Sequence, residues 1–209
     1  MSTHFYAFGS ICRGELDLSS DIDLLACVST PRLDIDPEKF SIYTYDRIKM
    51  LWSEGNPFAW HLYLESKMIY SSDNEDFIKG LGLPAEYLNS NIDCKKFRSI
   101  FLEASNSLKN SKNSIVFNLS CMFLAMRNFA TCFSFRSRKP IFSRKSPLLI
   151  ENPIPISNET YELFSRARIL STRGYGTLLS DEECLIVQSY IPVILNWMDK
   201  LIKDDKINE

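Results

Sequence analysis

The segments Phe8-Gly9-Ser10 and Asp21-Ile22-Asp23-Leu24, with ten residues of spacer between them, place a glycine turn before a pair of carboxylates. The run from His4 to Phe8 is short and rich in aromatic residues, which is typical of a buried strand. Glycine allows the chain to turn sharply after that strand and leaves backbone amides that can hold a phosphate. The sequence therefore predicts a strand that ends at an anion-binding turn.

The residues after the turn add to this prediction. We expect a short helix from Ser10 to Leu16, which would place the amides of Gly9 and Ser10 at a helix N-terminus, where the macrodipole favours an anion. Ser10 adds a hydroxyl, and Arg13 can steady phosphate charge, although an ordinary surface arginine is the alternative. Gly9, Ser10 and Arg13 are thus candidate contacts for a phosphate-bearing ligand.

The run from Asp21 to Val28 has the period of two that a strand requires, with Asp21 and Asp23 on one face. Two neighbouring carboxylates repel each other, and such a pair normally persists because a divalent cation lies between them. Hard oxygen ligands on a strand suit Mg²⁺ that already carries substrate phosphates. Asp21 and Asp23 are therefore candidate metal ligands.

The order of strand, Gly9-Ser10, spacer and apolar-flanked Asp21-x-Asp23 resembles the nucleotidyltransferases of the DNA polymerase beta superfamily. Arg13-Gly14-Glu15 and the run from Ser20 to Asp23 make it most similar to the small bacterial branch, which includes minimal and aminoglycoside nucleotidyltransferases. The resemblance implies Mg²⁺-dependent transfer of a nucleoside monophosphate from an NTP, such as ATP, to a hydroxyl of a protein, an RNA or a small molecule. It assigns catalysis and metal binding to Asp21 and Asp23, and nucleotide binding to Gly9, Ser10 and Arg13.

The third carboxylate of this superfamily is not evident in the sequence. A third strand is expected from Phe40 to Tyr45, and the matching position is Ser41, with Tyr43 next on the same face. Neither side chain binds a metal as a carboxylate does, although Asp34, Asp36 or Asp46 could fold in from either end of the strand. The alternative function is therefore a weak or inactive nucleotide-binding module of a bacterial toxin–antitoxin or defence system. A purely structural protein, in which the aspartates cap turns, is the third possibility.

The apolar pattern changes from strand period to helix period after a polar bridge from Ser71 to Asn91. Long apolar stripes follow within 97–108, 115–133, 161–170 and 186–201, and Ser180 with Glu183 forms a capping box. The predicted class is α+β: a small mixed-sheet nucleotidyltransferase-like domain at 1–90 and an all-α four-helix bundle at 91–209. Such a bundle is similar to the substrate-binding domains of aminoglycoside nucleotidyltransferases and to HEPN proteins, but Arg127 lacks the downstream histidine of HEPN ribonucleases.

Charge is unevenly distributed along the chain. The net charge is −2, yet residues 104–150 carry eight basic side chains and no acidic one. Within 135–146 the cations are Arg136, Arg138, Lys139, Arg144 and Lys145. This segment is either a solvated loop or a contact for a polyanionic or protein acceptor, such as a triphosphate or an RNA backbone.

Composition supports a globular protein of the cytoplasm. The 209 residues are 45% hydrophobic and 24% charged, which is enough for a full core. The six cysteines show no CxxC spacing, so neither zinc nor disulfides are expected. No leader and no apolar run of the ~20 residues that a membrane span needs is recognised. His61 is expected to be a packed helix residue rather than a catalytic base.

Overall fold

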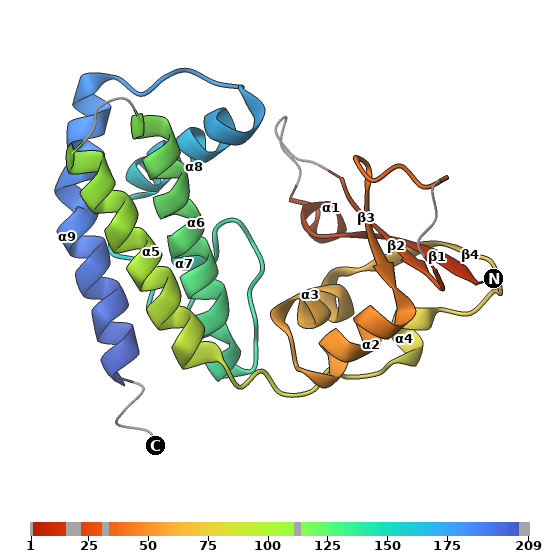
Figure 1. Cartoon of the computed structure of the whole chain (residues 1–209). Helices are drawn as coiled ribbons and strands as arrows, with labels where there is room; N and C mark the ends of the chain where they lie inside the picture. Colours follow the sequence, from red (N-terminus) through yellow and green to blue (C-terminus); the bar gives the residue numbers. More distant parts are fainter. Residues whose placement is uncertain (1, 16–21, 31–33, 111–113, 205–209) are drawn as a thin grey trace. The chain divides into compact units, whose positions relative to one another are not determined.

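The computed structural model describes residues 2–15, 22–30, 34–110 and 114–204. The contacts between Cα atoms divide the chain into two compact units, residues 1–88 (unit 1) and 89–209 (unit 2). Unit 1 contains a sheet with helices, and unit 2 is helical (Figure 1). The predicted α+β class is therefore confirmed.

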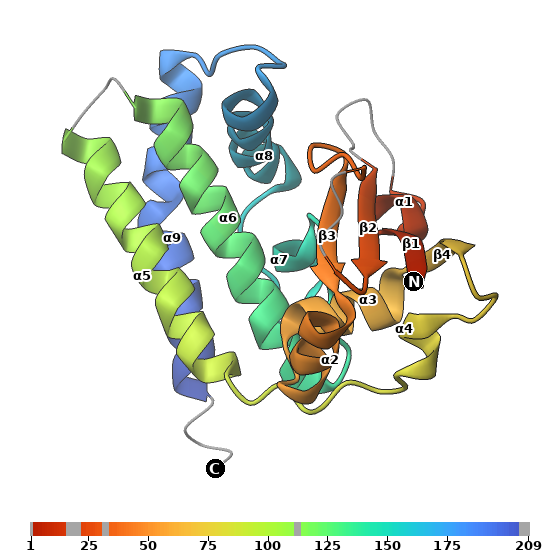
Figure 2. The same cartoon turned by 45° about the vertical axis from the view of Figure 1, so that its right-hand side comes forward.

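The sheet of unit 1 is mixed. Its strands are β1 (Thr3–Phe8), β2 (Asp23–Val28), β3 (Phe40–Thr44) and β4 (Lys67–Ser71), in the order β3-β2-β1-β4. β1 runs antiparallel to both of its neighbours, whereas β3 runs parallel to β2 (Figure 2). The start of β2 therefore lies beside the end of β1 and the start of β3.

Helices α2 (Tyr45–Ser53), α3 (Pro57–Glu65) and α4 (Phe77–Gly80) cover one face of this sheet. Alternation along the strands supplies that face with apolar side chains, and the helices contribute theirs at helical spacing. The buried cluster consists of Tyr6, Phe8, Leu25, Cys27, Ile48, Leu51, Trp52, Ala59, Leu62 and Ile78. This core fixes the strand ends on which the predicted site residues lie.

Polar side chains cap two helix starts of unit 1. Asn56 caps α3, because its side-chain oxygen accepts a hydrogen bond from the backbone N–H of Phe58 at 2.9 Å. Thr44, and not Asp46, caps α2. The hydroxyl of Thr44 accepts from the N–H of Arg47 at 3.2 Å, so Asp46 lies inside the first helical turn.

Unit 2 is built from long helices and two short turns. They are α5 (Ser90–Asn110), α6 (Ile115–Ser134), the 3₁₀ turn η2 (Phe135–Ser137), α7 (Ser146–Leu149), α8 (Asn158–Arg173) and α9 (Asp181–Asp204). The capping box before α9 is confirmed: Glu183 N–H donates to Ser180 Oγ at 3.2 Å, and Ser180 N–H donates to Glu183 Oε2 at 2.8 Å. Pro192 lies inside α9.

Helix α6 is the most apolar of these elements. Contrary to the expectation from the sequence, the segment Ile115–Ser137 has the length and composition of a membrane span, but 61% of its most apolar window is buried inside the fold. Phe123, Met126 and Phe129 are among its side chains that are packed away from solvent. A buried core helix can have the same length and composition as a membrane span.

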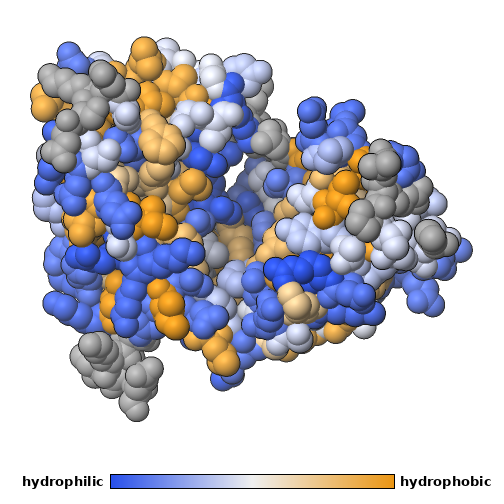
Figure 3. Space-filling view, viewed as in Figure 1, coloured by the Kyte–Doolittle hydropathy of each residue, from blue (hydrophilic) through white to orange (hydrophobic). Residues whose placement is uncertain are grey.

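On the face of the molecule that Figure 3 shows, hydrophobic residues lie in separate patches among hydrophilic ones.

Candidate functional site

The predicted Gly-Ser turn follows β1 directly. Gly9 has φ +75° and ψ −142°, a conformation that L side chains rarely adopt. A Cβ atom built on Gly9 would lie only 2.5 Å from Oδ2 of Asp23. The backbone angle favours glycine here, and a Cβ atom would also have to displace the end of the Asp23 side chain. We call Phe8, Gly9, Ser10 and Asp23 the Gly9–Asp23 corner.

The strand register explains why these residues meet. Phe8, the last residue of β1, pairs with Asp23, the first residue of β2. The side chain of Asp23 is exposed, and it shares a sheet face with the buried Leu25. Two of the predicted elements, the turn and one carboxylate, therefore lie together at one end of the sheet. Asp21 lies outside the described residues.

The helix after the turn is shorter than expected. α1 spans only Ser10–Arg13, because Gly14 adopts a left-handed conformation with φ +73° and ends it. The N–H of Glu15 then donates to the carbonyl of Ser10 at 3.0 Å. The predicted helix from Ser10 to Leu16 is therefore corrected to a single turn.

Arg13 is held inside unit 1 rather than left bare on its surface. Its Nη1 donates to Oε2 of Glu65, and its Nε donates to Oε2 of Glu15 at 3.0 Å. His61 Nε2 lies 2.9 Å from the same Glu65 oxygen. The side chains of Arg13, His61 and Glu65 are only 18%, 14% and 14% exposed. This network ties α1 to the end of α3.

Glu65 was not predicted from the sequence, whereas His61 packs within unit 1 as expected. The two lie four residues apart on α3, on one helix face, and this spacing was the available signal. The His61 ring also packs edge-on against Phe8, with 5.6 Å between ring centroids. His61 therefore contacts both the arginine network and the last residue of β1.

Ser41, the matching position for a third carboxylate, lies on the same sheet face as Asp23. In the parallel pairing of β2 and β3, Ser41 is opposite Leu25, which is two residues after Asp23. The Ser41 side chain is exposed, whereas Tyr43 packs against Phe58 with 5.4 Å between ring centroids. Ser41 can supply a hydroxyl to this face, and Tyr43 belongs to the core.

The strand directions also decide which of the candidate carboxylates lies at the same end of the sheet as Asp23. The turn that contains Asp36 leads into β3, and the start of β3 lies beside the start of β2. Asp36 Oδ1 accepts from the N–H of Glu38 at 2.9 Å, and its Oδ2 lies 3.2 Å from Lys39 Nζ. The bond from the Glu38 N–H, followed by the contact with Lys39, lowers the pKa of Asp36. Asp36 therefore stays ionised at the end of the sheet that carries Asp23.

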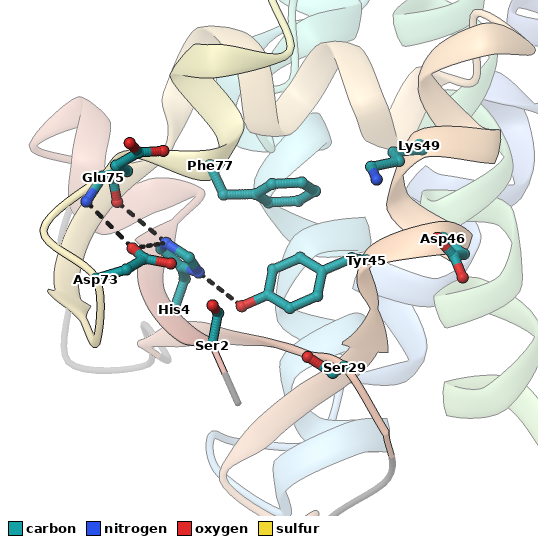
Figure 4. Close-up of a pocket in the computed structure, with 9 residues that line it drawn as sticks. All are labelled: Ser2, His4, Ser29, Tyr45, Asp46, Lys49, Asp73, Glu75 and Phe77. Carbon is teal, nitrogen blue, oxygen red and sulfur yellow. Dashed lines mark hydrogen bonds and ion pairs between the residues drawn. The ribbon is translucent and has the colours of Figure 1, made fainter.

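Asp46 lies at the other end of the sheet, where it lines a pocket of about 400 Å³ (Figure 4). Buried His4 also lines this pocket and makes polar contacts there: its Nδ1 lies 2.7 Å from the Tyr45 hydroxyl, and its Nε2 lies 3.1 Å from Asp73 Oδ1. Hydrogen bonds, first from Ser71, lower the pKa of Asp73 to about 2. These contacts join the segment after β4 to α2. Asp46 is therefore not placed to serve the Gly9–Asp23 corner.

The predicted basic segment of unit 2 has mixed roles. Arg136 Nη1 donates to the Leu201 carbonyl at 3.1 Å, and its guanidinium lies 4.5 Å from the centroid of the Phe133 ring. Arg138 has φ 55° and is exposed, as is Lys139, which lines a pocket of about 540 Å³ together with Arg136. Arg136 thus stabilises the fold of unit 2, while Arg138 and Lys139 reach solvent.

Of the two predicted metal ligands, only Asp23 lies in the described part of the chain. In the ranges that the structure covers, no group of three or more His, Cys, Asp or Glu side chains is arranged around one point. Asp23 is exposed, and carboxylate oxygens are the ligands that Mg²⁺ prefers. The chemistry of this one described donor fits Mg²⁺.

The fold is similar to that of a solved adenyltransferase. Spectinomycin adenyltransferase AAD(9) from Enterococcus faecialis, solved with ATP and spectinomycin, aligns over 94% of this chain and 91% of its own, with 14% sequence identity and a TM-score of 0.49. No protein-family model and no curated protein matches the sequence. The function must therefore be inferred from the geometry of the Gly9–Asp23 corner.

Proposed function

We propose that this protein is a nucleotidyltransferase that transfers a nucleoside monophosphate from an NTP to an acceptor hydroxyl. The acceptor oxygen forms a bond to the α phosphorus, the bond from that phosphorus to pyrophosphate breaks, and the hydroxyl proton passes to a carboxylate or to water. The observation that supports the proposal is the close approach of Gly9, which has a positive φ, to the exposed carboxylate of Asp23. This approach brings a candidate phosphate-binding turn next to a candidate metal ligand.

Each residue of the corner has a role in this proposal. The backbone amides of Gly9 and Ser10, with the Ser10 hydroxyl, bind the β and γ phosphates. Asp23, together with Asp21, would hold Mg²⁺, which when bound neutralises phosphate charge and favours in-line displacement. Arg13 holds the turn in place through its pairing with Glu65, and its remaining N–H groups would donate hydrogen bonds to a phosphate oxygen.

Transfer of an α-³²P label tests the proposal. Incubation of the protein with α-labelled NTP, Mg²⁺ and candidate protein, RNA or small alcohol acceptors should give labelled acceptor and free pyrophosphate. Asp23→Asn should abolish labelling while the thermal unfolding midpoint stays within a few degrees of the wild type. Equal labelling by Asp23→Asn and wild type would contradict the assignment of the site.

Ser41 supports a second candidate function, a nucleotide-binding module with little or no turnover. The exposed hydroxyl of Ser41 lies on the face of Asp23, where a third carboxylate would activate the acceptor. Such a module would serve as a component of a bacterial toxin–antitoxin or defence system. It is distinguished from the enzyme by tight binding of Mg·NTP without label transfer to any acceptor.

Further features of the proposal concern the whole chain. Residues 1–90 would form the nucleotidyltransferase domain, and residues 91–209 would form the bundle domain that recognises the acceptor. The solvent-facing cations Arg138 and Lys139 are the part of the basic segment that suits a polyanionic or protein acceptor. A place in the cytoplasm is part of the proposal, because the cysteine spacing in the sequence predicts no disulfide framework.

A further inference from the structure

Helix α9 of unit 2 has two contrasting sides. It packs against α5 and α8 (Figure 1), and its inner side buries Val187, Ile194 and Met198. The opposite side presents a row of exposed residues at helical spacing: Leu185, Ile186, Ser189, Val193 and Asn196. We call this row the outer stripe. The described helices of unit 2 therefore leave the outer stripe open to solvent.

The outer stripe is uncharged and partly apolar. Residues 184–198 contain no charged side chain, whereas the exposed face of a helix in a globular protein normally carries charged and polar residues. Leu185 is 66% exposed, Ile186 40% and Val193 37%. Single exposed apolar residues are ordinary, but a contiguous apolar row is typical of an interaction surface. The small side chain of Ser189, in the middle of the row, allows another helix to approach closely.

Opposite charges mark the two ends of the outer stripe. Glu182 and Lys200 are 18 residues apart, which is five helical turns, so both lie on the face of the stripe, ~27 Å from each other along the helix axis. Both side chains are exposed, and among the described residues neither has an ion-pair partner. A face with an acid at its start, a base at its end and only uncharged residues between them matches a reversed copy of itself.

We propose that the outer stripe is the interface of a homodimer in which the α9 helices of two copies of this chain run antiparallel about a two-fold axis. Such an axis brings the same patch of both copies together, so every contact forms twice. Reversal about the midpoint of the stripe sets Glu182 opposite the partner's Lys200, and Ser189 opposite the partner's Val193. The apolar residues supply the contact, and the charges at the ends fix its direction. The proposal does not depend on the Gly9–Asp23 corner.

Sedimentation equilibrium of the full-length protein without nucleotide, from ~1 to ~300 µM, tests the interface. Because one pair of helices makes a small interface, we expect a monomer–dimer equilibrium with a Kd of ~10–100 µM. Leu185→Glu places a charge in the contact twice and should weaken the dimer at least ~10-fold. Phe117→Glu is the matched control, since it makes the same change in charge at an apolar residue of α6 that is 63% exposed. It should change the Kd less than ~2-fold, within the effect of net charge alone.

Exchange of the end charges tests the antiparallel direction, and it keeps the test intact if Leu185→Glu does not fold. Glu182→Lys or Lys200→Glu alone sets like charges against each other at both ends and should weaken the dimer at least ~3-fold. The double variant should restore the wild-type Kd. An equimolar mixture of the two single variants should form a heterodimer that is tighter than either homodimer, because every facing pair then has opposite charges.

Three results would overturn the proposal. A wild type that stays monomeric at ~300 µM would leave the outer stripe to a different protein partner. Equal weakening by Leu185→Glu and Phe117→Glu would place the dimer contact elsewhere on the chain. Failure of both the double variant and the mixture to restore association would exclude the antiparallel pairing of Glu182 with the partner's Lys200.

Discussion

Gly9 and Gly14 share a positive φ but differ in ψ and in what a side chain would meet. Their φ angles are +75° and +73°, yet a Cβ on Gly9 would lie 2.5 Å from Asp23 Oδ2, whereas a Cβ on Gly14 would have no atom of the described structure within 4 Å. Gly14→Ala should lose ~1–2 kcal/mol of unfolding free energy from its left-handed backbone, and Gly9→Ala should lose ~1–3 kcal/mol, because its ψ of −142° lies outside that region. Denaturant unfolding measures this loss.

The two glycine variants should separate in nucleotide binding. Only Gly9→Ala displaces the Asp23 carboxylate, so only Gly9→Ala should lose affinity for Mg·NTP beyond its loss of stability. Fluorescence titration with a labelled nucleotide checks this result. If Gly14→Ala weakens binding as much as Gly9→Ala does, the close approach of Gly9 to Asp23 has no functional meaning.

Ser41 offers a gain-of-function test at the residue scale. Because Ser41 is exposed on the face of Asp23, Ser41→Asp should create or raise transfer activity with little change in NTP affinity, since the added carboxylate acts on the reaction step. Initial rates of α-label transfer at saturating NTP measure the effect. A wild type that is already fast, and is slowed by Ser41→Asp, would show that another carboxylate, with Asp36 the nearest candidate by strand order, fills this role.

At the scale of elements, the pairing of Arg13 with Glu65 fixes α1 against α3. Glu65→Gln should lower the unfolding free energy by ~1–3 kcal/mol, because it leaves the mostly buried Arg13 and His61 without their shared carboxylate. Glu15→Gln is the matched control: it removes the other partner of Arg13, whose side chain is 43% exposed, and should cost less than ~1 kcal/mol. Equal losses in urea unfolding would mean that the network does not anchor α1.

The elements also show which parts of the structure can be predicted from sequence. The cap of α3 at Asn56 and the capping box at Ser180 depend on residues within one helical turn, so local chemistry is sufficient. The Arg13 network joins residues that are 52 positions apart, and only the packing of α3 on the sheet brings them together. The end of α1 at Gly14 was missed because the apolar pattern continues past that glycine. The position of Asp23 beside the end of β1 follows from the pairing of two strands that the sequence predicted.

At the scale of the whole molecule, the two units divide the chemistry between them. Unit 1 contains the glycine turn with its carboxylate, and unit 2 contains the solvent-facing cations Arg138 and Lys139. Because a nucleotide that binds only the folded protein stabilises it, saturating Mg·NTP at ~100 times its Kd should add ~2.7 kcal/mol to the unfolding free energy. A shift of the thermal unfolding midpoint that needs both Mg²⁺ and NTP would report this linkage.

Calorimetric titration with the magnesium complex of a non-hydrolysable NTP analogue, for the wild type and for Asp23→Asn, tests the Gly9–Asp23 corner most directly. Asp23→Asn removes the proposed metal ligand without removing a buried side chain, so the affinity should fall at least ~10-fold, or ~1.4 kcal/mol, with an unchanged unfolding midpoint. Titration with the same analogue in EDTA should show a much smaller difference between the two proteins. Undiminished affinity of Asp23→Asn for the magnesium complex would contradict the assignment of this corner as the nucleotide site.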